Sequence, residues 1–389
     1  MTVAPKPLRV AQLVETLDAG GAEALAVDIA AALAARGHDS HLIVARGDGP
    51  FRERVKPEVV FHDLARPRRD GNQVFRIMYF LGTCRRLEAH LRARRIDVLQ
   101  THLPKANFLG LVMAWRGVCR VYPTVHNNRE FDYGDRAGRA KRALRRFGYS
   151  RMLAHCSAVI AVSDQVKESL ARQLRTPPGR KERIRVVPNG VRLPEPLRAG
   201  ERDRLREALG VTGEQLLVAG AGRLTRQKNF TRLVEALGRL DVNGPDWRCV
   251  IAGDGELRTD LEAQVAAAGL GDRVRMPGLV ADLPGLFAAA DIFCLPSLFE
   301  GLPLVLLEAM GAGLPTAAFA IDGVSDVVSD GNQARLVAPD DAAALADALA
   351  ALLADGPQRQ RLGAAAKEAV RTRYGFEAVV DRLETVYRR

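Results

Sequence analysis

The chain has 389 residues, which is too long for one hydrophobic core and fits two domains of similar size. Hydrophobic residues make up 47% of it, as in globular proteins, and it has no run of about eighteen apolar residues that would predict a membrane-spanning helix. The N-terminus leads directly into a strand-like segment without the apolar core of a signal peptide, so we expect a cytoplasmic protein. Five scattered cysteines without a CxxC pair predict reduced thiols.

The net charge of +11 is distributed unevenly along the chain. Residues 1–195 contain 35 Lys and Arg against 19 Asp and Glu, a net charge of +16, whereas residues 196–389 have a net charge of −5. A basic half suits an anionic partner, either lipid headgroups or nucleic acid. Aromatic residues are only 5% of the chain and do not interleave with the basic segments, so the sequence favours an anionic membrane surface and no nucleic acid.

Short apolar strand patterns alternate with amphipathic helix patterns, which predicts parallel sheets covered by helices. In the first run, the turn at residues 16–23 opens a helix, and Gly21 would let the backbone approach an anion at the helix N-terminus. His102 and His126 each follow a strand pattern, and either could face a ligand, although a structural role is the alternative for both. The strand patterns of this run are at residues 8–14, 41–45, 97–101, 121–124, 159–163 and 184–188.

The densest basic segment is residues 138–151, GRAKRALRRFGYSR, with six basic residues and no acidic one. Ala140, Leu144 and Phe147 fall on one helical stripe, a pattern typical of an interfacial helix. A solvated basic helix face is the alternative. The predicted acceptor or membrane patch consists of His102, Arg139, Lys141, Arg142, Arg145 and Arg146.

Residues 189–200 are rich in Gly and Pro and have no apolar periodicity, which is typical of a linker. The second run of strand patterns is at residues 215–220, 248–253, 273–277, 291–296, 315–319 and 334–337. We expect an α/β protein in which two Rossmann-like, doubly wound parallel-sheet domains face each other across a cleft. The expected domains are residues 1–192 and 193–373, with a helix at residues 374–389 that crosses back to the first.

The segment GAGRLTRQKNF in the second run presents Arg223 and Lys228 after a strand. A diphosphate carries about two negative charges, and these side chains suit its two phosphates. The chain has no DxD triplet and no histidine pair with ligand spacing, so we expect no metal and no other cofactor. Gly253, in the Gly-rich turn after the next strand, would border the nucleobase. A basic loop in solvent is the alternative.

The segment FEGLPLVLLEAM, residues 299–310, places one glutamate in a loop and a second in the helix that follows. With a helix start near Leu302, Glu308 would lie about two turns in and face a ribose diol. Two ordinary surface glutamates are the alternative. Glu300 would lie beside the backbone N–H groups of Gly301, Leu302 and Leu304, which suit phosphate and sugar oxygens.

Together these motifs resemble glycosyltransferase family 4, a family of retaining nucleotide-sugar enzymes with the GT-B fold. The resemblance covers nearly the whole chain and rests on GGAE, TVHN, AVSD, VVPNGV, GRLTRQKN, IAGDGELR and LPSLFEGLPLVLLEAM. It implies that Gly21 approaches the donor phosphate, that Arg223 and Lys228 neutralise the diphosphate, and that Glu300 binds sugar hydroxyls. It also implies that Glu308 holds the ribose and that His126 lies beside the donor sugar and the acceptor.

The resemblance further implies a hexose-type transfer from a nucleoside-diphosphate sugar, a UDP-sugar in the first place, with retention and without a metal. The expected acceptor is a lipid-linked or growing glycan for an envelope polysaccharide, at the cytoplasmic face of the membrane. A GT-B-fold sugar-nucleotide epimerase or hydrolase is the alternative, and a nucleic-acid-binding protein is a third reading. The chain departs from the family pattern at Arg192 and at DGVSD, residues 322–326, and we expect neither departure to touch the core site.

Overall fold

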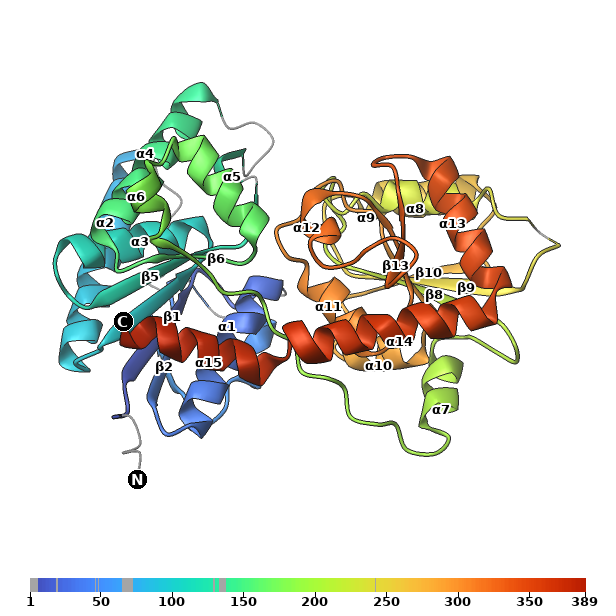
Figure 1. Ribbon diagram of the computed structural model, residues 1–389, viewed down its shortest axis with the longest axis horizontal. Coiled ribbons are helices and arrows are strands. Elements are labelled where there is room, and N and C mark those ends of the chain that lie inside the picture. The colour runs from blue at the N-terminus through green and yellow to red at the C-terminus, as the bar shows by residue number, and fades with distance from the viewer. Residues whose placement is uncertain are drawn as a thin grey trace. The chain divides into compact units, whose positions relative to one another are not determined.

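The computed structural model describes residues 6–18, 20–45, 47, 49–64, 73–128, 130–132, 138–241 and 243–389. The chain divides into two compact units (Figure 1). Unit 1 consists of residues 1–189 and 377–389, and unit 2 consists of residues 190–376. The last helix of the chain therefore belongs to the same unit as the first strands.

Within the described part of the chain, unit 1 contains a seven-stranded parallel sheet in the order β3-β2-β1-β4-β5-β6-β7. Its strands are β1 (Arg9–Val14), β2 (Asp39–Val44), β3 (Val60–Asp63), β4 (Val98–His102), β5 (Arg120–Val125), β6 (Val159–Ala161) and β7 (Ile184–Val186). Its helices are α1 (Gly21–Ala35), η1 (Pro50–Arg54), α2 (Gln73–Ala93), α3 (Leu103–Trp115), η2 (Glu130–Asp132), α4 (Arg139–His155), α5 (Asp164–Leu174), α6 (Pro178–Lys181) and α15 (Phe376–Arg388). The edge strand β3 was not predicted, because its residues are only partly buried and form no continuous apolar run.

As far as the structure describes it, unit 2 contains a six-stranded parallel sheet in the order β10-β9-β8-β11-β12-β13. Its strands are β8 (Leu216–Ala221), β9 (Trp247–Ala252), β10 (Val274–Gly278), β11 (Ile292–Leu295), β12 (Thr316–Phe319) and β13 (Ala334–Val337). Its helices are α7 (Glu201–Ala208), α8 (Phe230–Leu237), α9 (Arg258–Ala267), α10 (Leu283–Ala289), α11 (Leu304–Gly311), α12 (Asp322–Ser325), α13 (Ala342–Ala354) and α14 (Gly356–Arg373).

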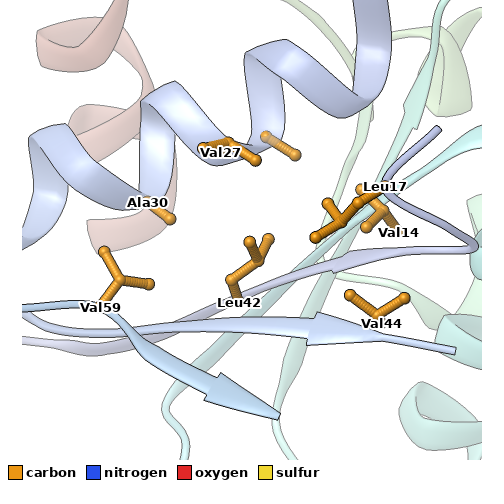
Figure 2. Close-up of a cluster of buried hydrophobic side chains, with 8 residues drawn as sticks. Val14, Leu17, Val27, Ala30, Leu42, Val44 and Val59 are labelled. Atoms are coloured by element: carbon orange, nitrogen blue, oxygen red, sulfur yellow. The ribbon is translucent and has the colours of Figure 1, made fainter. Parts of the chain in front are cut away.

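The strands of unit 1 are buried and mostly apolar because helices cover the sheet, as in other parallel sheets. In β1 every residue after Arg9 is buried. The alanine-rich helix α1, with its high helix propensity, packs Val27 and Ala30 toward Leu42 and Val44 of β2 (Figure 2). This cluster holds the middle of α1 against β2 and the end of β1. Because α1 follows β1 after a short loop, its N-terminus lies at the carboxyl edge of the sheet.

Each sheet has one point at which the strand order reverses. In unit 1 the reversal falls between β1 and β4, and in unit 2 it falls between β8 and β11. The loops that follow two such strands diverge, and doubly wound sheets bind their ligands in the crevice that this divergence leaves. The fold therefore directs attention to the segments after these four strands.

The predicted fold of two Rossmann-like, doubly wound parallel-sheet domains is confirmed. All five cysteines are free thiols, and four of them are buried, as expected for reduced structural residues. None of the helices in the described segments has the length and hydrophobicity needed to cross a membrane.

Candidate active site

A buried ion pair lies at the switch point of unit 2. Lys228 comes from the loop between β8 and α8, and Glu300 from the loop between β11 and α11. The Lys228 Nζ and Glu300 Oε1 atoms are 2.6 Å apart, and the two side chains are only 14% and 8% exposed. Because desolvation of two charges offsets most of their attraction, such a pair contributes little to stability by itself. Its location makes it a candidate for ligand binding.

The two loops that carry this pair are also joined through Gln227. Its side-chain amide donates a hydrogen bond to the Phe299 carbonyl (3.0 Å), and its backbone carbonyl accepts one from the Leu298 N–H (2.9 Å). Sequence reasoning missed Gln227, although it stands directly before Lys228 in the motif. Because its two hydrogen bonds join the loops, we expect the two loops to move together.

Two glycines set the path of the β8 loop. Gly222 and Gly253 have φ values of +149° and +141°, a region that favours glycine. A Cβ atom on Gly253 would lie 1.9 Å from the Gly222 carbonyl oxygen, and one on Gly222 would lie 3.2 Å from Lys228 Cε. Gly253 therefore supports the loop on which the lysine stem lies. Its place beside a nucleobase stays a prediction.

Helix α11 begins at Leu304, two residues later than predicted. The predicted start near Leu302 is wrong because the residue before a proline is disfavoured in the helical region, and Pro303 itself is extended (φ −71°, ψ 112°). Glu308 is therefore the fifth helical residue, little more than one turn from the N-terminus rather than two, and it is exposed.

The remaining predicted donor residues lie close to these loops in the sequence. Arg223 is exposed and directly follows Gly222. Gly301 and Leu302 are buried between Glu300 and the helix. Leu304 is the first residue of α11, where backbone N–H groups have no partner within the helix, and its role as a donor to an anion stays a prediction.

The DGVSD segment does touch the core site, so the expectation that it would not is wrong. A Cβ atom on Gly323 would lie 2.7 Å from the backbone carbon and oxygen of Glu300. The contact arises because β11 and β12 are neighbours, and α12 after β12 packs against the loop after β11. Arg192, the other departure, stacks on the ring of Phe376 at 4.3 Å.

In unit 1, two histidines meet at the ends of adjacent strands. His102 ends β4 and His126 follows β5, and the two strands pair in parallel. His102 Nδ1 and His126 Nε2 are 3.1 Å apart. Burial lowers the pKa of His126 to about 4, and burial next to His126 lowers the pKa of His102 well below its usual range. Both rings are therefore neutral at pH 7, and the side chains can exchange hydrogen bonds without charge.

The sequence pattern predicts His102 in an acceptor or membrane patch, but the structure does not expose this residue. Its side chain is fully buried, whereas His126 is half-buried. His102 ends a central strand, and its ring lies between Gln12 of the neighbouring strand β1, at 2.8 Å, and His126, at 3.1 Å. Gly21 is exposed at the first position of α1, and the N-cap residue of this helix is Gly20, which has no side chain.

The rest of the predicted patch lies on α4. Lys141, Arg142 and Arg146 are exposed, and Arg145 is half-buried and donates a hydrogen bond to the Phe131 carbonyl (3.3 Å). The side chain of Arg139 lies outside the described part of the chain. The same helix exposes two large apolar side chains, Leu144 (66%) and Phe147 (63%).

A buried acid near this helix was not predicted. Tyr149 of α4 donates a hydrogen bond to Glu130, which is 4% exposed. Burial raises the pKa of Glu130 to about 7. The sequence shows Glu130 in a polar loop among charged residues, so nothing in the pattern predicts its burial.

Comparisons with known proteins agree with this fold. The profile described as Glycosyltransferase Family 4 matches residues 19–194, and the profile described as Glycosyl transferases group 1 matches residues 201–369. The D-inositol 3-phosphate glycosyltransferase of Xylanimonas cellulosilytica is 32% identical over 96% of this chain and 92% of its own length. The alpha-D-kanosaminyltransferase of Streptomyces kanamyceticus is 30% identical, and the matched region spans 60% of each chain.

Solved structures show the same fold. Sucrose-phosphate synthase from Thermosynechococcus elongatus matches with a TM-score of 0.83 at 23% identity, over 98% of both chains. HepE from Anabaena, solved in complex with UDP-glucose, matches with a TM-score of 0.81 at 20% identity, over 97% of this chain and 98% of its own. The protein is thus a glycosyltransferase of the GT-B type. The chain belongs to glycosyltransferase family 4, as its motifs predicted.

Proposed function

We propose that this enzyme transfers a hexose-type sugar from a UDP-sugar to a lipid-linked or growing glycan in envelope polysaccharide biosynthesis. The observation that carries the proposal is the buried pair of Lys228 and Glu300 at the switch point of unit 2. An Escherichia coli relative, 32% identical over 62% of each chain, is named as a UDP-Gal:alpha-D-GlcNAc-diphosphoundecaprenol alpha-1,3-galactosyltransferase. The UDP-glucose complex of HepE supports a UDP-sugar donor.

The paired charges suit the two halves of a sugar diphosphate. Lys228 donates to a phosphate oxygen, and Glu300 accepts hydrogen bonds from sugar hydroxyls, so the pair fits the junction between phosphate and sugar. Arg223 supplies a second cation after the Gly222 turn. Glu308 holds the ribose diol, and Gly253 supports the loop that presents the lysine.

Transfer proceeds with retention by a front-face route. The acceptor oxygen bonds to the anomeric carbon on the face from which the diphosphate departs, while the bond between that carbon and the phosphate oxygen breaks. The acceptor proton passes to the departing phosphate oxygen, so no side-chain base is needed. Lys228 and Arg223 stabilise the leaving charge in place of a metal ion, and such electrostatic stabilisation is usually the largest catalytic contribution. Gly21 and the N-terminus of α1 approach the donor phosphate, and His126 contacts the donor sugar or the acceptor.

A transfer assay with purified protein tests this proposal. Candidate UDP-sugars are offered with a bacterial lipid-linked glycan fraction, in buffer with EDTA, and nucleotide release is measured together with NMR of the product's anomeric proton. We expect acceptor-dependent release and a retained anomeric configuration. Lys228→Met and Glu300→Gln should each lose turnover, whereas Arg226→Met, which removes an exposed charge from the same loop, should retain it. Full activity in both site variants would refute the assignment, and free sugar or an epimer formed without acceptor would indicate a hydrolase or epimerase.

We also propose that α4 docks the enzyme peripherally on the cytoplasmic face of an anionic membrane. Exposed Leu144 and Phe147 on a helix with several exposed cations combine apolar insertion with headgroup attraction. Each basic residue near such a surface contributes about 1 kcal/mol of binding. A lipid-linked acceptor makes this location useful, because enzyme and acceptor then share one surface.

Co-sedimentation with vesicles containing anionic lipid tests the docking. Changing Arg142, Arg145 and Arg146 to Ser should reduce binding by about two orders of magnitude at low salt. A control with the same loss of charge changes Lys367, Arg371 and Arg373 of α14, which are all exposed. Equal binding by wild type and the α4 variant would refute the docking, and equal losses in both variants would reduce it to a general charge effect.

A further inference from the structure

We propose that a directed chain of hydrogen bonds in unit 1 fixes the tautomer of His126, with His102, Gln12 and Tyr387 as its positioning residues. Only the catalytic consequence of this chain rests on the proposed function. This hydrogen-bond chain begins at Tyr387 on α15, the last helix, and ends at the ring of His126 after β5.

The Tyr387 end of the hydrogen-bond chain is anchored by two side chains of the central strands. The Tyr387 hydroxyl donates to Gln100 Oε1, and the Gln100 amide in turn donates to Thr124 Oγ1 (2.8 Å). The Tyr387 oxygen then accepts a hydrogen bond from Gln12 Nε2 (3.4 Å). The amide of Gln12 is thereby oriented, with its Oε1 atom on the opposite side.

This orientation determines the protons of both histidines. Gln12 Oε1 is 2.8 Å from His102 Nε2 and can only accept, so His102 carries its proton on Nε2. The His102 Nδ1 atom is then a lone pair, 3.1 Å from His126 Nε2. His126 must therefore carry its proton on Nε2. Its Nδ1 atom is left as an acceptor on a half-buried ring.

Burial makes the direction of the chain an all-or-none property. Gln12, Gln100, His102 and Tyr387 are each at most 2% exposed. If one link reversed alone, two donors or two acceptors would face each other without water, and a buried polar group left unpaired costs about 1–3 kcal/mol. A full reversal would require both amides to rotate together. The low pKa of His102 also keeps this ring neutral, so it cannot donate from both nitrogens.

The C-terminal helix is seated so that it can hold this anchor. Arg36, at the end of α1, bonds to the Glu377 and Asp381 carboxylates at 2.8 and 2.6 Å. His38 Nε2 lies 3.0 Å from Glu384 Oε1. The α15 helix is therefore fastened to unit 1 along its length (Figure 1), and Tyr387 near its end closes the buried network.

Tyr387→Phe tests the proposal with the smallest change. It removes the hydroxyl and leaves the ring, which packs against the Tyr122 ring at 5.5 Å between centroids. Tyr122→Phe is the matched control, because it removes a hydroxyl from the same ring pair but not from the chain. Gln12→Leu is the second variant, which breaks the chain at another link. The tautomers are measured by two-bond nitrogen–proton couplings in protein labelled with ¹⁵N-histidine, and His126→Gln identifies the His126 signals.

We expect a single Nε2–H form of His126 in wild type and in Tyr122→Phe, and a mixture of both tautomers in Tyr387→Phe and Gln12→Leu. The signals of His102 should change together with those of His126. Unchanged signals from the five histidines outside the hydrogen-bond chain report an intact fold; these are His38, His41, His62, His90 and His155. A single Nε2–H form in both chain variants would overturn the proposal, as would a mixture or a single Nδ1–H form in wild type.

The kinetic readout separates positioning from donor binding. In Tyr387→Phe we expect kcat to fall by about tenfold, because a misdirected catalytic group costs turnover, while the donor KM stays within about twofold. An unchanged kcat with mixed tautomers would overturn the catalytic part of the proposal. Full transfer by His126→Gln would instead refute the role of His126 in the proposed function and leave the tautomer result to stand on the NMR alone.

Discussion

Replacing Lys228 by Met separates the structural and catalytic roles of the buried pair in unit 2. The change keeps the aliphatic stem over Gly222 but leaves the Glu300 carboxylate, with its 8% exposure, without the cation 2.6 Å away. Breaking a buried ion pair on one side costs about 3–5 kcal/mol, because the remaining charge has lost both water and partner. Gln227, whose Nε2 atom lies 3.5 Å from Glu300 Oε2, still offers a weak hydrogen bond, so we expect about 3 kcal/mol.

A double-mutant cycle makes the magnitude testable. Lys228→Met with Glu300→Gln removes both charges, so its cost should be smaller than that of Lys228→Met alone, with a coupling of about 2 kcal/mol. All three variants should lose transfer, since each lacks the cation, the carboxylate or both. Stability would thus recover in the double variant while activity would not.

The chain offers a reporter for unit 2. It has two tryptophans, of which Trp115 in unit 1 is 73% exposed and Trp247 in β9 is 2% exposed. In a Trp115→Phe background, urea unfolding followed by Trp247 fluorescence reports the free energy of unfolding of unit 2. If Lys228→Met cost less than about 1 kcal/mol and the two changes were additive, the reasoning about a desolvated, coupled pair would be refuted.

Three further predictions concern other buried groups. Because the pKa of Glu130 is raised to about 7, the folded protein loses stability as the pH rises from about 4.5 to 7. Glu130→Gln should therefore raise the free energy of unfolding by about 2–3 kcal/mol at pH 8 and change it little at pH 4. Equal effects at both pH values would contradict this. Partial burial lowers the pKa of His90 to about 4, so its contribution to stability is complete above pH 6.5 and is lost as the pH falls toward 4. Chemical denaturation should show that His90→Leu flattens this acid loss, and an unaltered pH slope would refute it. A Cβ at Gly323 would lie 2.7 Å from the Glu300 backbone, so Gly323→Ala should displace that loop and raise the donor KM about tenfold or more. Gly271→Ala is the control and should leave KM unchanged, because a Cβ there meets no atom within 4 Å and the backbone needs no positive φ. Normal kinetics in Gly323→Ala would refute the displacement of the Glu300 loop.

The architecture was predictable because parallel strands covered on both faces are continuous apolar runs. The strand β1 is buried from Val10 to Val14, and its pattern is legible without coordinates. The locations of Lys228 and Glu300 were predictable for the same reason, since each follows a buried strand and carboxyl ends of neighbouring strands share an edge. Their separation of 2.6 Å was not, because it depends on how two loops of different length fold over each other.

Local rules also set the limits of prediction at the start of α11. The pattern from Leu302 onward is helical in hydrophobicity, but the restriction that Pro303 imposes on the preceding residue prevails and delays the helix by two residues. The contact between Gly323 and Glu300 was missed for a different reason. It depends on the adjacency of β11 and β12, and a departure from a family motif in sequence does not indicate distance from the site in space.

The sequence does indicate part of the hydrogen-bond chain in unit 1, through polar residues within apolar strands. Gln12 interrupts the apolar run of β1, and Gln100 and His102 interrupt that of β4. A buried amide in a central strand is costly unless its donors and acceptors are paired, so two such strands side by side predict that their polar side chains share a network. What the strands do not predict is the partner from α15, because an amphipathic terminal helix can pack on many surfaces. The identity of Tyr387 as the anchor emerges only when the last helix is placed on the first sheet.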